Sequence, residues 1–399
     1  MDAAINARNT PLLLLNEDQM RANIALMQTR LDKASVVARP HVKTAKSLPV
    51  VAQMVAADAN PRLTVSTLRE ASQVMAAGYK DILYAVGMVP QKLPDLRALA
   101  NQHGARVSVI LDSCEMAQAF VQEQQKHQGH ENALPDGSGA IGLDAFIELD
   151  VDNHRAGVQP DGEELMAIGQ ILGASLLRGV MTHAGGAYDC HSLAELETMA
   201  ERERSGAVRA ADVLRRLGLD CPEVSIGSTP TACTARSFSG VSEVRVGVYV
   251  FNDLVMSGLG VCQQEDIAIS VLATVIGHQR RRNTLLIDAG WMALSSDRGT
   301  SGHRVDQGLG LVVAAGAAGA NAAGVKSDDD LIVAQANQEH GLVVPRSGAA
   351  LDFRRYPIGS QLRILPVHAC ATAAQFDGYL VKAQGQPDRF WPRFGGWNV

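Results

Sequence analysis

Short apolar runs alternate with amphipathic stretches over the first two-thirds of the chain. In the stretches between the runs, apolar residues recur every three or four positions, which predicts helices over 48–57, 68–77, 93–103, 165–173 and 193–217. The runs themselves are typical of buried strands and cover 36–43, 63–66, 82–86, 107–111, 145–150, 179–183, 223–226 and 243–250. Eight strands alternating with helices predict a (β/α)8 barrel, and an open doubly wound sheet is the alternative.

The pattern changes after about residue 262. Strand-like runs follow one another without helical stretches between them, at 267–277, 284–288, 331–334, 342–344 and 361–366. We therefore predict a second, all-β domain, formed by residues 1–21 plus 259–399, beside a barrel over residues 22–258. Two stretches interrupt the pattern and are predicted loops: a polar insertion at 123–142, and a Gly/Ala-rich surface loop at 314–324 that continues through 327–330.

Charge and composition narrow the function classes. The net charge is -6, and the longest run of basic residues is Arg280-Arg281-Arg282, which argues against a nucleic-acid surface. The apolar run Leu12–Leu15 is too short for a signal peptide or a membrane span. Six cysteines without a CxxC pair fit a reducing compartment. We expect a cytoplasmic enzyme.

Polar residues gather where the predicted barrel strands end. In such a barrel the catalytic groups lie at the C-terminal ends of the strands. The predicted strands end in Lys43-Thr44, Asp112-Ser113, Glu148 to Asp150 with Arg155 beyond, Thr182 to Gly186, Gly227 to Thr229, and Arg245 to Gly247. This concentration predicts an active site.

Lys43 is the candidate nucleophile. A lysine attacks a carbonyl when burial or cationic neighbours lower its pKa, and Arg39 and His41 alternate with it on the predicted strand. The alternative is a surface lysine that opens the next helix, a description that fits Lys46 better.

Two glycine-containing turns are candidates for a phosphate site, because inward-facing backbone N–H groups bind phosphate. Gly227-Ser228-Thr229 precedes a helix-like stretch, and Gly247 ends the following strand, where barrel phosphate sites commonly lie. His183, among Thr182 and glycines, would face a flat cofactor or be a core histidine. Arg155 would bind an anionic oxygen or be a loop charge.

In the second domain, His368 and Cys370 have the i, i+2 spacing that places two side chains on one side of an extended segment. Imidazole and thiol there would bind one divalent metal, in a site completed by water or substrate. The alternative is a pair of buried structural residues. The polar cluster 337–341 could supply outer-shell partners.

The chain resembles a known family in six segments that follow one another in order. The segment Arg39-Pro40-His41-Val42-Lys43-Thr44-Ala45-Lys46 resembles the lysine motif of fold-type III pyridoxal-phosphate enzymes, in the D-serine dehydratase and D-threonine aldolase branch. The match continues through residues 182–185, 227–231, 247–251, 288–291 and 366–370. The resemblance covers nearly the whole chain and implies an alanine-racemase-like barrel with a β domain, usually a homodimer.

The resemblance also implies roles for single residues. Lys43 would form the Schiff base with pyridoxal phosphate and act as the base at Cα. His183 would pack against the pyridine ring, Arg155 would bind the phenolic oxygen, and Tyr188 would lie near the substrate. The phosphate would be held by Ser228, Thr229, Gly247 and Val248.

Two further roles carry departures from the family pattern. Arg245 corresponds by position to the arginine that faces the pyridine nitrogen, although the motif reads Arg-Val-Gly rather than Arg-Pro-Gly. His368 and Cys370 would bind the divalent metal, which is zinc, manganese, magnesium or cobalt. Relatives of the aldolase type tend to have Asp where Cys370 stands, so this residue favours a dehydratase. Ala45 stands where many relatives have His.

The implied reaction is β-elimination from a D-3-hydroxy amino acid, most readily D-threo-3-hydroxyaspartate, to a 2-oxo acid and ammonia. A retro-aldol lyase acting on D-threonine or 3-hydroxyaspartate uses the same groups, and D-serine is an alternative substrate. A metal-free racemase and a non-catalytic cofactor carrier are more distant alternatives. The substrate side chain could be bound by Arg298, His340 or His154.

Overall fold

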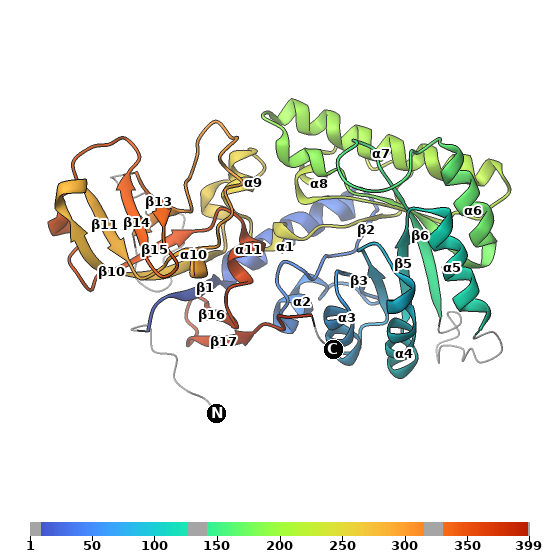
Figure 1. Ribbon diagram of the computed structural model, residues 1–399, viewed down its shortest axis with the longest axis horizontal. Helices are drawn as coiled ribbons and strands as arrows, with labels where there is room; N and C mark the ends of the chain where they lie inside the picture. Colours follow the sequence, from blue (N-terminus) through green and yellow to red (C-terminus); the bar gives the residue numbers. More distant parts are fainter. Residues whose placement is uncertain (1–8, 127–141, 315–329, 398–399) are drawn as a thin grey trace. The chain divides into compact units, whose positions relative to one another are not determined.

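The computed structural model describes residues 9–126, 142–314 and 330–397, and the chain falls into two units (Figure 1). The first, here called the barrel unit, contains residues 27–247 and the last residues of the chain. The second, the β unit, contains the residues up to Leu26 together with Val248–Gly395. Among the described residues, no helix is both long and apolar enough to span a membrane.

The barrel unit is built on eight parallel strands, in the order β2-β9-β8-β7-β6-β5-β4-β3. A parallel bridge between His41 and Thr64 joins the two ends of this sheet. The predicted (β/α)8 barrel is thereby confirmed. Its strands are β2 (Val37–Ala38), β3 (Arg62–Val65), β4 (Asp81–Tyr84), β5 (Arg106–Leu111), β6 (Leu143–Leu149), β7 (Leu177–Thr182), β8 (Glu223–Ile226) and β9 (Glu243–Val244).

Strands β2 and β9 are shorter than predicted. The chain after β2 stays extended and hydrogen-bonded, since Arg39 N donates to Val244 O at 2.9 Å and His41 N to Val246 O at 2.7 Å. Pro40 lies between them and has no N–H to add to the ladder. Lys43 lies in the turn after this segment. The prediction that Lys43 ends a strand is therefore wrong.

Helices cover the outside of the barrel, and several of them begin at side-chain caps. Thr67, Ser113, Ser192 and Ser228 each accept a backbone N–H of the first turn that follows. The helices are α1 (Glu17–Lys33), α2 (Leu48–Met54), α3 (Leu68–Ala76), α4 (Leu93–His103), α5 (Cys114–Gln125), α6 (Glu163–Leu176), α7 (Leu193–Arg216) and α8 (Thr229–Thr234). Residues 123–125 belong to α5, so the predicted insertion loop begins too early; its part from 127 to 141 lies outside the described residues.

The β unit is a sheet of nine strands, in the order β11-β14-β13-β12-β15-β10-β1-β16-β17. An additional pairing of β10 with β11 closes six of these strands into an antiparallel barrel. The predicted all-β domain is confirmed. Its strands are β1 (Leu12–Asn16), β10 (Ile269–Gln279), β11 (Thr284–Ile287), β12 (Leu311–Ala314), β13 (Leu331–Ala336), β14 (Gly341–Pro345), β15 (Gln361–Leu365), β16 (Gly378–Lys382) and β17 (Arg389–Pro392).

Three short α-helices lie in the described part of the β unit: α9 (Leu254–Gly258), α10 (Trp291–Leu294) and α11 (Ala369–Ala373). The first strand, β1, pairs antiparallel with β10 and parallel with β16. Ala314, predicted to begin a loop, ends β12, and residues 315–329 lie outside the described part of the chain.

A buried ionic cluster lies near the N-terminal ends of the barrel strands. The Arg39 side chain is wholly buried; its Nε lies 2.8 Å from the carboxylate of Glu243, and its Nη1 lies 2.7 Å from Asp81. Arg62 Nη1 contacts Glu243 at 3.0 Å and Glu223 at 3.2 Å. Burial by itself raises the pKa of Glu243, but these cations outweigh it and lower the pKa to about 2.

Replacing Arg39 by methionine is expected to destabilise the protein by about 3–5 kcal/mol, because it leaves the buried Glu243 carboxylate without its main partner. Urea unfolding at neutral pH measures this. The double variant Arg39→Met/Glu243→Leu, which removes both charges, should recover most of the loss. A single variant as stable as the wild type would contradict this role of the pair.

The same pair has a consequence at low pH. The pKa of Glu243 is lower in the folded than in the unfolded chain, so its contribution is complete above the ordinary value of 4.5. We expect that contribution to be lost as the pH falls from 4.5 toward 2.

Candidate active site

Lys43, His41, His183 and Arg245 form a group of interacting side chains at the C-terminal ends of the barrel strands. The Lys43 side chain is exposed, and its backbone N–H donates to His41 Nδ1 at 3.3 Å. Burial, Lys43 and Arg245 lower the pKa of His41 well below its ordinary value, so this imidazole is neutral at neutral pH.

This geometry corrects the expectation that Arg39 and His41 are cationic neighbours of Lys43. His41 carries no charge at neutral pH, and Arg39 is held in the ionic cluster at the other end of the barrel. Lys46 is also engaged elsewhere, since its Nζ lies 3.1 Å from the buried Glu70 carboxylate. Arg245 interacts with both imidazoles of this group, and Arg155 interacts with His183.

His183 follows β7 and is a neutral ring. Burial is the main cause that lowers its pKa, to about 3, and Lys43 adds to the effect. Its Nδ1 lies 3.1 Å from the carbonyl oxygen of Gly227, so Nδ1 carries the hydrogen. The ring of Tyr188 lies 6.3 Å from the His183 ring, at 47° to it. A flat, uncharged imidazole held from one edge is suited to packing against a heteroaromatic ring.

Arg245 lies deeper in the barrel. Its side chain is buried, donates from Nη1 to Ser225 Oγ at 2.6 Å and also bonds the carbonyl oxygen of Thr182. Burial lowers its pKa to about 10, which leaves a cation at neutral pH. The guanidinium is therefore fixed by its neighbours before any ligand binds.

The loop after β8 is a buried turn closed by a capping box. Ser228 caps α8, with its hydroxyl accepting from Thr231 N and its own N–H donating to Thr231 Oγ1 at 3.1 Å. Ser228 and Thr229 are both buried. Gly227 has φ +129°, and a Cβ there would lie 2.6 Å from the carbonyl oxygen of Arg245, so only glycine fits this turn.

Gly247 and Val248 follow β9. A Cβ on Gly247 would lie 2.9 Å from Thr44 Oγ1, which shows how closely this backbone approaches the Lys43 turn. Val248 is buried and begins a short 3-10 helix, Val248–Val250, at the point where the chain enters the β unit.

Arg155 lies in the loop after β6. Its side chain is 59% exposed, and its Nη2 lies 3.4 Å from Glu148 Oε1. Burial raises the pKa of Glu148, and Arg155 offsets part of that effect. The loop is tied to the β7 loop, because Asp152 Oδ2 accepts from Gly186 N at 2.8 Å and His154 packs against Gly185.

His368 and Cys370 lie in the β unit at the start of α11. His368 is the N-cap residue and Cys370 lies in the first turn, so the predicted extended conformation of this segment is wrong. The turn forms because the Asp253 carboxylate accepts from Ala369 N at 2.9 Å. The two side chains still interact with one another.

Asp297, which the sequence analysis did not identify, orients the imidazole. Its Oδ2 lies 2.8 Å from His368 Nδ1, which leaves Nε2 for a metal. Among the described residues, no group of three or more His, Cys, Asp or Glu side chains could hold a metal ion, so a site here would be open, with two protein ligands. The cluster 337–341 acts elsewhere: Asn337 O accepts from Trp291 N at 3.0 Å, at the start of α10.

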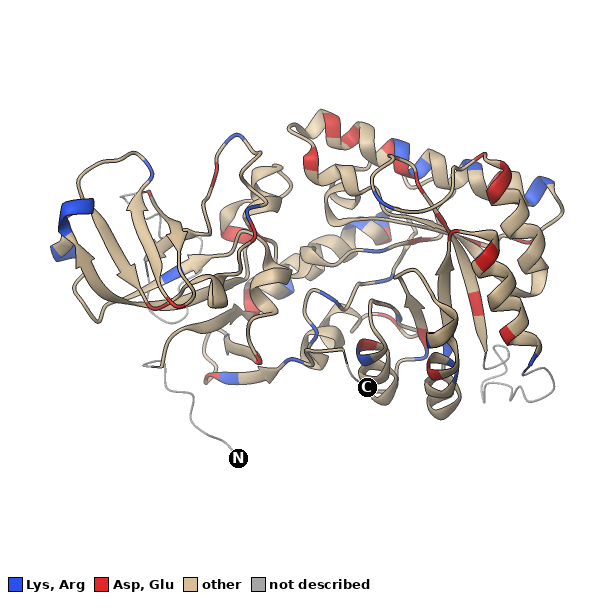
Figure 2. Cartoon of the chain, viewed as in Figure 1, with Lys and Arg blue, Asp and Glu red and all other residues tan. Residues whose placement is uncertain are grey.

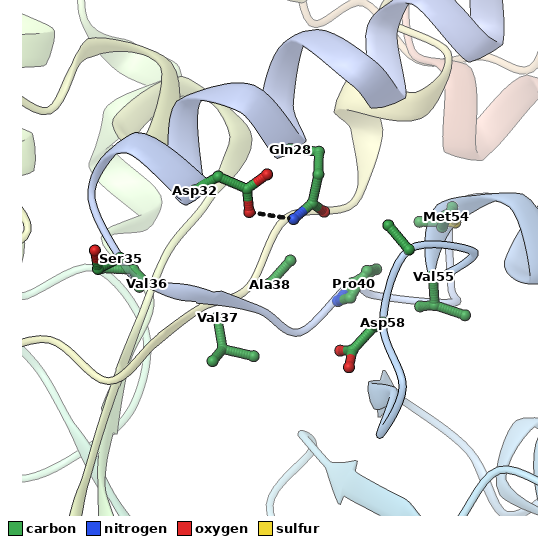
Figure 3. A pocket seen from close by; sticks show the side chains of 11 residues that line it. Gln28, Asp32, Ser35, Val36, Val37, Ala38, Pro40, Met54, Val55 and Asp58 are labelled. Atoms are coloured by element: carbon green, nitrogen blue, oxygen red, sulfur yellow. Dashed lines mark hydrogen bonds between the residues drawn. The ribbon is translucent and has the colours of Figure 1, made fainter.

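A pocket of about 360 Å³ lies on the outside of the barrel unit, next to β2 (Figure 3). Gln28 and Asp32 of α1, which share a 2.7 Å hydrogen bond, lie on one side of it, and Met54 and Val55 at the end of α2 on the other. Lys43, His183 and Arg245 do not line it. This pocket is therefore separate from the candidate active site.

Comparisons with known proteins support the fold and show the family. The model of the alanine racemase N-terminal domain matches residues 15–254, and that of the putative serine dehydratase domain matches residues 268–382. D-threo-3-hydroxyaspartate dehydratase of Delftia sp. (strain HT23) is 47% identical, over 98% of this chain and 98% of its own. D-serine dehydratase of Dictyostelium discoideum is 31% identical, over 94% of both chains.

A solved structure of D-threo-3-hydroxyaspartate dehydratase, a cysteine-to-alanine variant in the metal-free form, is also similar. It superposes with a TM-score of 0.89 at 45% identity and covers 98% of each chain. The alanine-racemase-like fold expected from the sequence is thereby confirmed.

Proposed function

Because the chain belongs to the fold-type III pyridoxal-phosphate family that joins an alanine racemase N-terminal domain to a serine dehydratase domain, we propose that it dehydrates D-threo-3-hydroxyaspartate to oxaloacetate and ammonia. The observation that carries this proposal is the full-length similarity to the Delftia enzyme, at 47% identity. Cys370, at a position where relatives of the aldolase type tend to have Asp, supports elimination over carbon–carbon cleavage.

We propose that the barrel unit binds pyridoxal phosphate, which accepts negative charge from the substrate Cα. Lys43 would hold the cofactor covalently through Nζ until the substrate amine takes its place, and the freed Nζ would then remove the Cα proton. Neutral His183 packs on the ring and Arg245 faces the ring nitrogen.

Tyr188 lies near the substrate and Arg155 binds the phenolic oxygen. The buried turn at Gly227 supports a phosphate site made by Ser228, Thr229, Gly247 and Val248.

We propose that the β unit binds a divalent metal through His368 Nε2 and Cys370 Sγ. Such an ion supplies Lewis acidity toward a hydroxyl leaving group. Imidazole with thiolate suits zinc, and manganese, magnesium or cobalt are the other candidates. The Asp297–His368 contact supports this assignment, since metal-binding histidines usually donate their second N–H to such a group.

Product analysis with D-threo-3-hydroxyaspartate tests the proposal. We expect oxaloacetate and ammonia in equal amounts. Glycine and glyoxylate would instead identify a retro-aldol lyase, and an inverted Cα configuration would identify a racemase. Ammonia release from D-serine, D-threonine and the other 3-hydroxyaspartate isomers then defines the substrate range.

Asparagine in place of Asp297 is expected to weaken metal binding about 10- to 100-fold, because the imidazole loses its orienting carboxylate. Titrating metal back into the metal-free protein, with activity as the readout, measures this. Asp306→Asn is the matched control, since Asp306 lies in the same loop and pairs with Arg298 rather than with His368. Equal metal affinities in the two variants would contradict the role of Asp297.

We further propose a homodimer in a reducing compartment, where the six free cysteines would be stable. Light scattering of the purified protein tests the oligomeric state.

A further inference from the structure

Glu203 is a buried carboxylate on a helix whose other acidic residues reach solvent. Helix α7 carries acidic residues along much of its length (Figure 2), and Glu203 has no exposed surface. Burying a carboxylate is unfavourable unless its oxygens are bonded. Its hydrogen bonding therefore indicates which part of the protein this carboxylate stabilises.

One hydrogen bond and one helix contact relate Glu203 to two different loops. Glu203 Oε1 accepts from Ala184 N at 2.9 Å, in the loop after β7. Its Oε2 has no hydrogen-bond partner among the described residues, and burial raises the pKa of this carboxyl. Helix α7 packs against α8, which follows the loop after β8. Glu203 therefore holds the loop after β7 to a helix that also contacts the element after β8.

Both loops carry groups assigned above to the cofactor. His183 directly precedes Ala184, and Ser228 and Thr229 lie between Gly227 and Thr231. The bond from His183 Nδ1 to Gly227 O, at 3.1 Å, joins the same two loops on the side of the ring. The position of the His183 loop relative to the phosphate loop therefore depends on Glu203, which holds the His183 loop from helix α7.

We propose that Glu203 is a positioning residue that fixes the His183 loop relative to the phosphate loop and so determines the affinity for pyridoxal phosphate. The inference rests on the proposed function for the identity of the cofactor. Glu203 acts through its bond to Ala184 N and through the packing of α7 on α8, and it does not touch the reacting atoms.

The test compares Glu203→Leu, Glu203→Gln and Asp144→Asn in the full-length protein. Leucine removes the acceptor of Ala184 N, whereas glutamine keeps one oxygen for it. Asp144 is a matched control, because it is a buried carboxylate of the same barrel, at the start of β6, and it bonds Arg106 and Ser108 instead.

The measured quantity is the dissociation constant for pyridoxal phosphate, from titration of the cofactor-free protein. We expect Glu203→Leu to bind about 10- to 100-fold more weakly, the cost of leaving the buried Ala184 N–H without its acceptor. Glu203→Gln should be intermediate. Asp144→Asn should lower the melting temperature of the cofactor-free protein without changing the dissociation constant.

Two results would overturn the proposal: Glu203→Leu binding within about twofold of the wild type, or Asp144→Asn losing as much affinity as Glu203→Leu. Should Glu203→Leu be insoluble, the ³¹P resonance of cofactor bound to Glu203→Gln decides. We expect it to shift, and an unchanged resonance with unchanged affinity would count against Glu203. A wild-type protein that binds no pyridoxal phosphate would refute the proposed function itself.

Discussion

Alanine in place of Lys43 is expected to lower kcat for ammonia release by at least about 1,000-fold, because the variant has neither a covalent link to the cofactor nor a base at the substrate Cα. The visible absorbance of lysine-bound cofactor should disappear from the purified variant. Borohydride reduction of the wild type, followed by peptide mapping, should place the pyridoxyl group on Lys43.

The surface residue Lys80, whose Nζ bonds the carbonyl oxygen of His103, provides the control. Lys80→Ala should keep both the absorbance and the activity. Substantial turnover by Lys43→Ala, or a pyridoxyl group on another lysine, would remove the central assignment of the site.

Removing the metal is expected to lower kcat about 100- to 10,000-fold. This corresponds to losing several kcal/mol of transition-state stabilisation by a Lewis acid. Chelation and the variants His368→Ala and Cys370→Ala should act alike, and the cofactor absorbance should persist in each. Cys262→Ala, which changes another free cysteine of the β unit, should remain active. Full activity after exhaustive chelation would favour a metal-free racemase or lyase.

The metal should bind more tightly as the pH rises. Burial tends to lower the pKa of His368, but Asp297 and Cys370 outweigh it and raise the pKa to about 11 in the metal-free protein. A metal that binds Nε2 must therefore displace a proton. Metal titrations at pH 6, 7 and 8 should show this release, since each lower pH weakens binding.

The barrel could be predicted because its strands give short, mainly apolar runs between helical patterns. The ends of β2 and β9 were placed too late, since the chain stays extended and bonded after the ladder stops. Strand β1 was missed for another reason: Leu12–Leu15 has no alternation, and its partners β10 and β16 are distant in sequence.

Candidate groups of the site could be predicted where they follow a strand end, as Lys43, His183 and Arg245 do. Their supporting contacts could not, because folding alone creates them. Asp297 meets His368 across 71 positions, and the Asp253 cap that makes Ala369 helical acts across 116. Glu203 lies only 19 positions from Ala184. It could not be predicted because nothing in the sequence distinguishes it from the solvent-facing glutamates of the same helix.

The pairing of β1 determines the order in which the newly made chain can fold. All eight barrel strands lie between residues 37 and 244, so their partners are present once about two-thirds of the chain has been synthesised. Strand β1 precedes the barrel strands in the chain. Its antiparallel partner β10 begins at residue 269, and its parallel neighbour β16 is complete only at residue 382. The apolar segment Leu12–Leu15 therefore lacks both sheet partners while the barrel strands are being synthesised, and during that time it is exposed to chaperones and to aggregation.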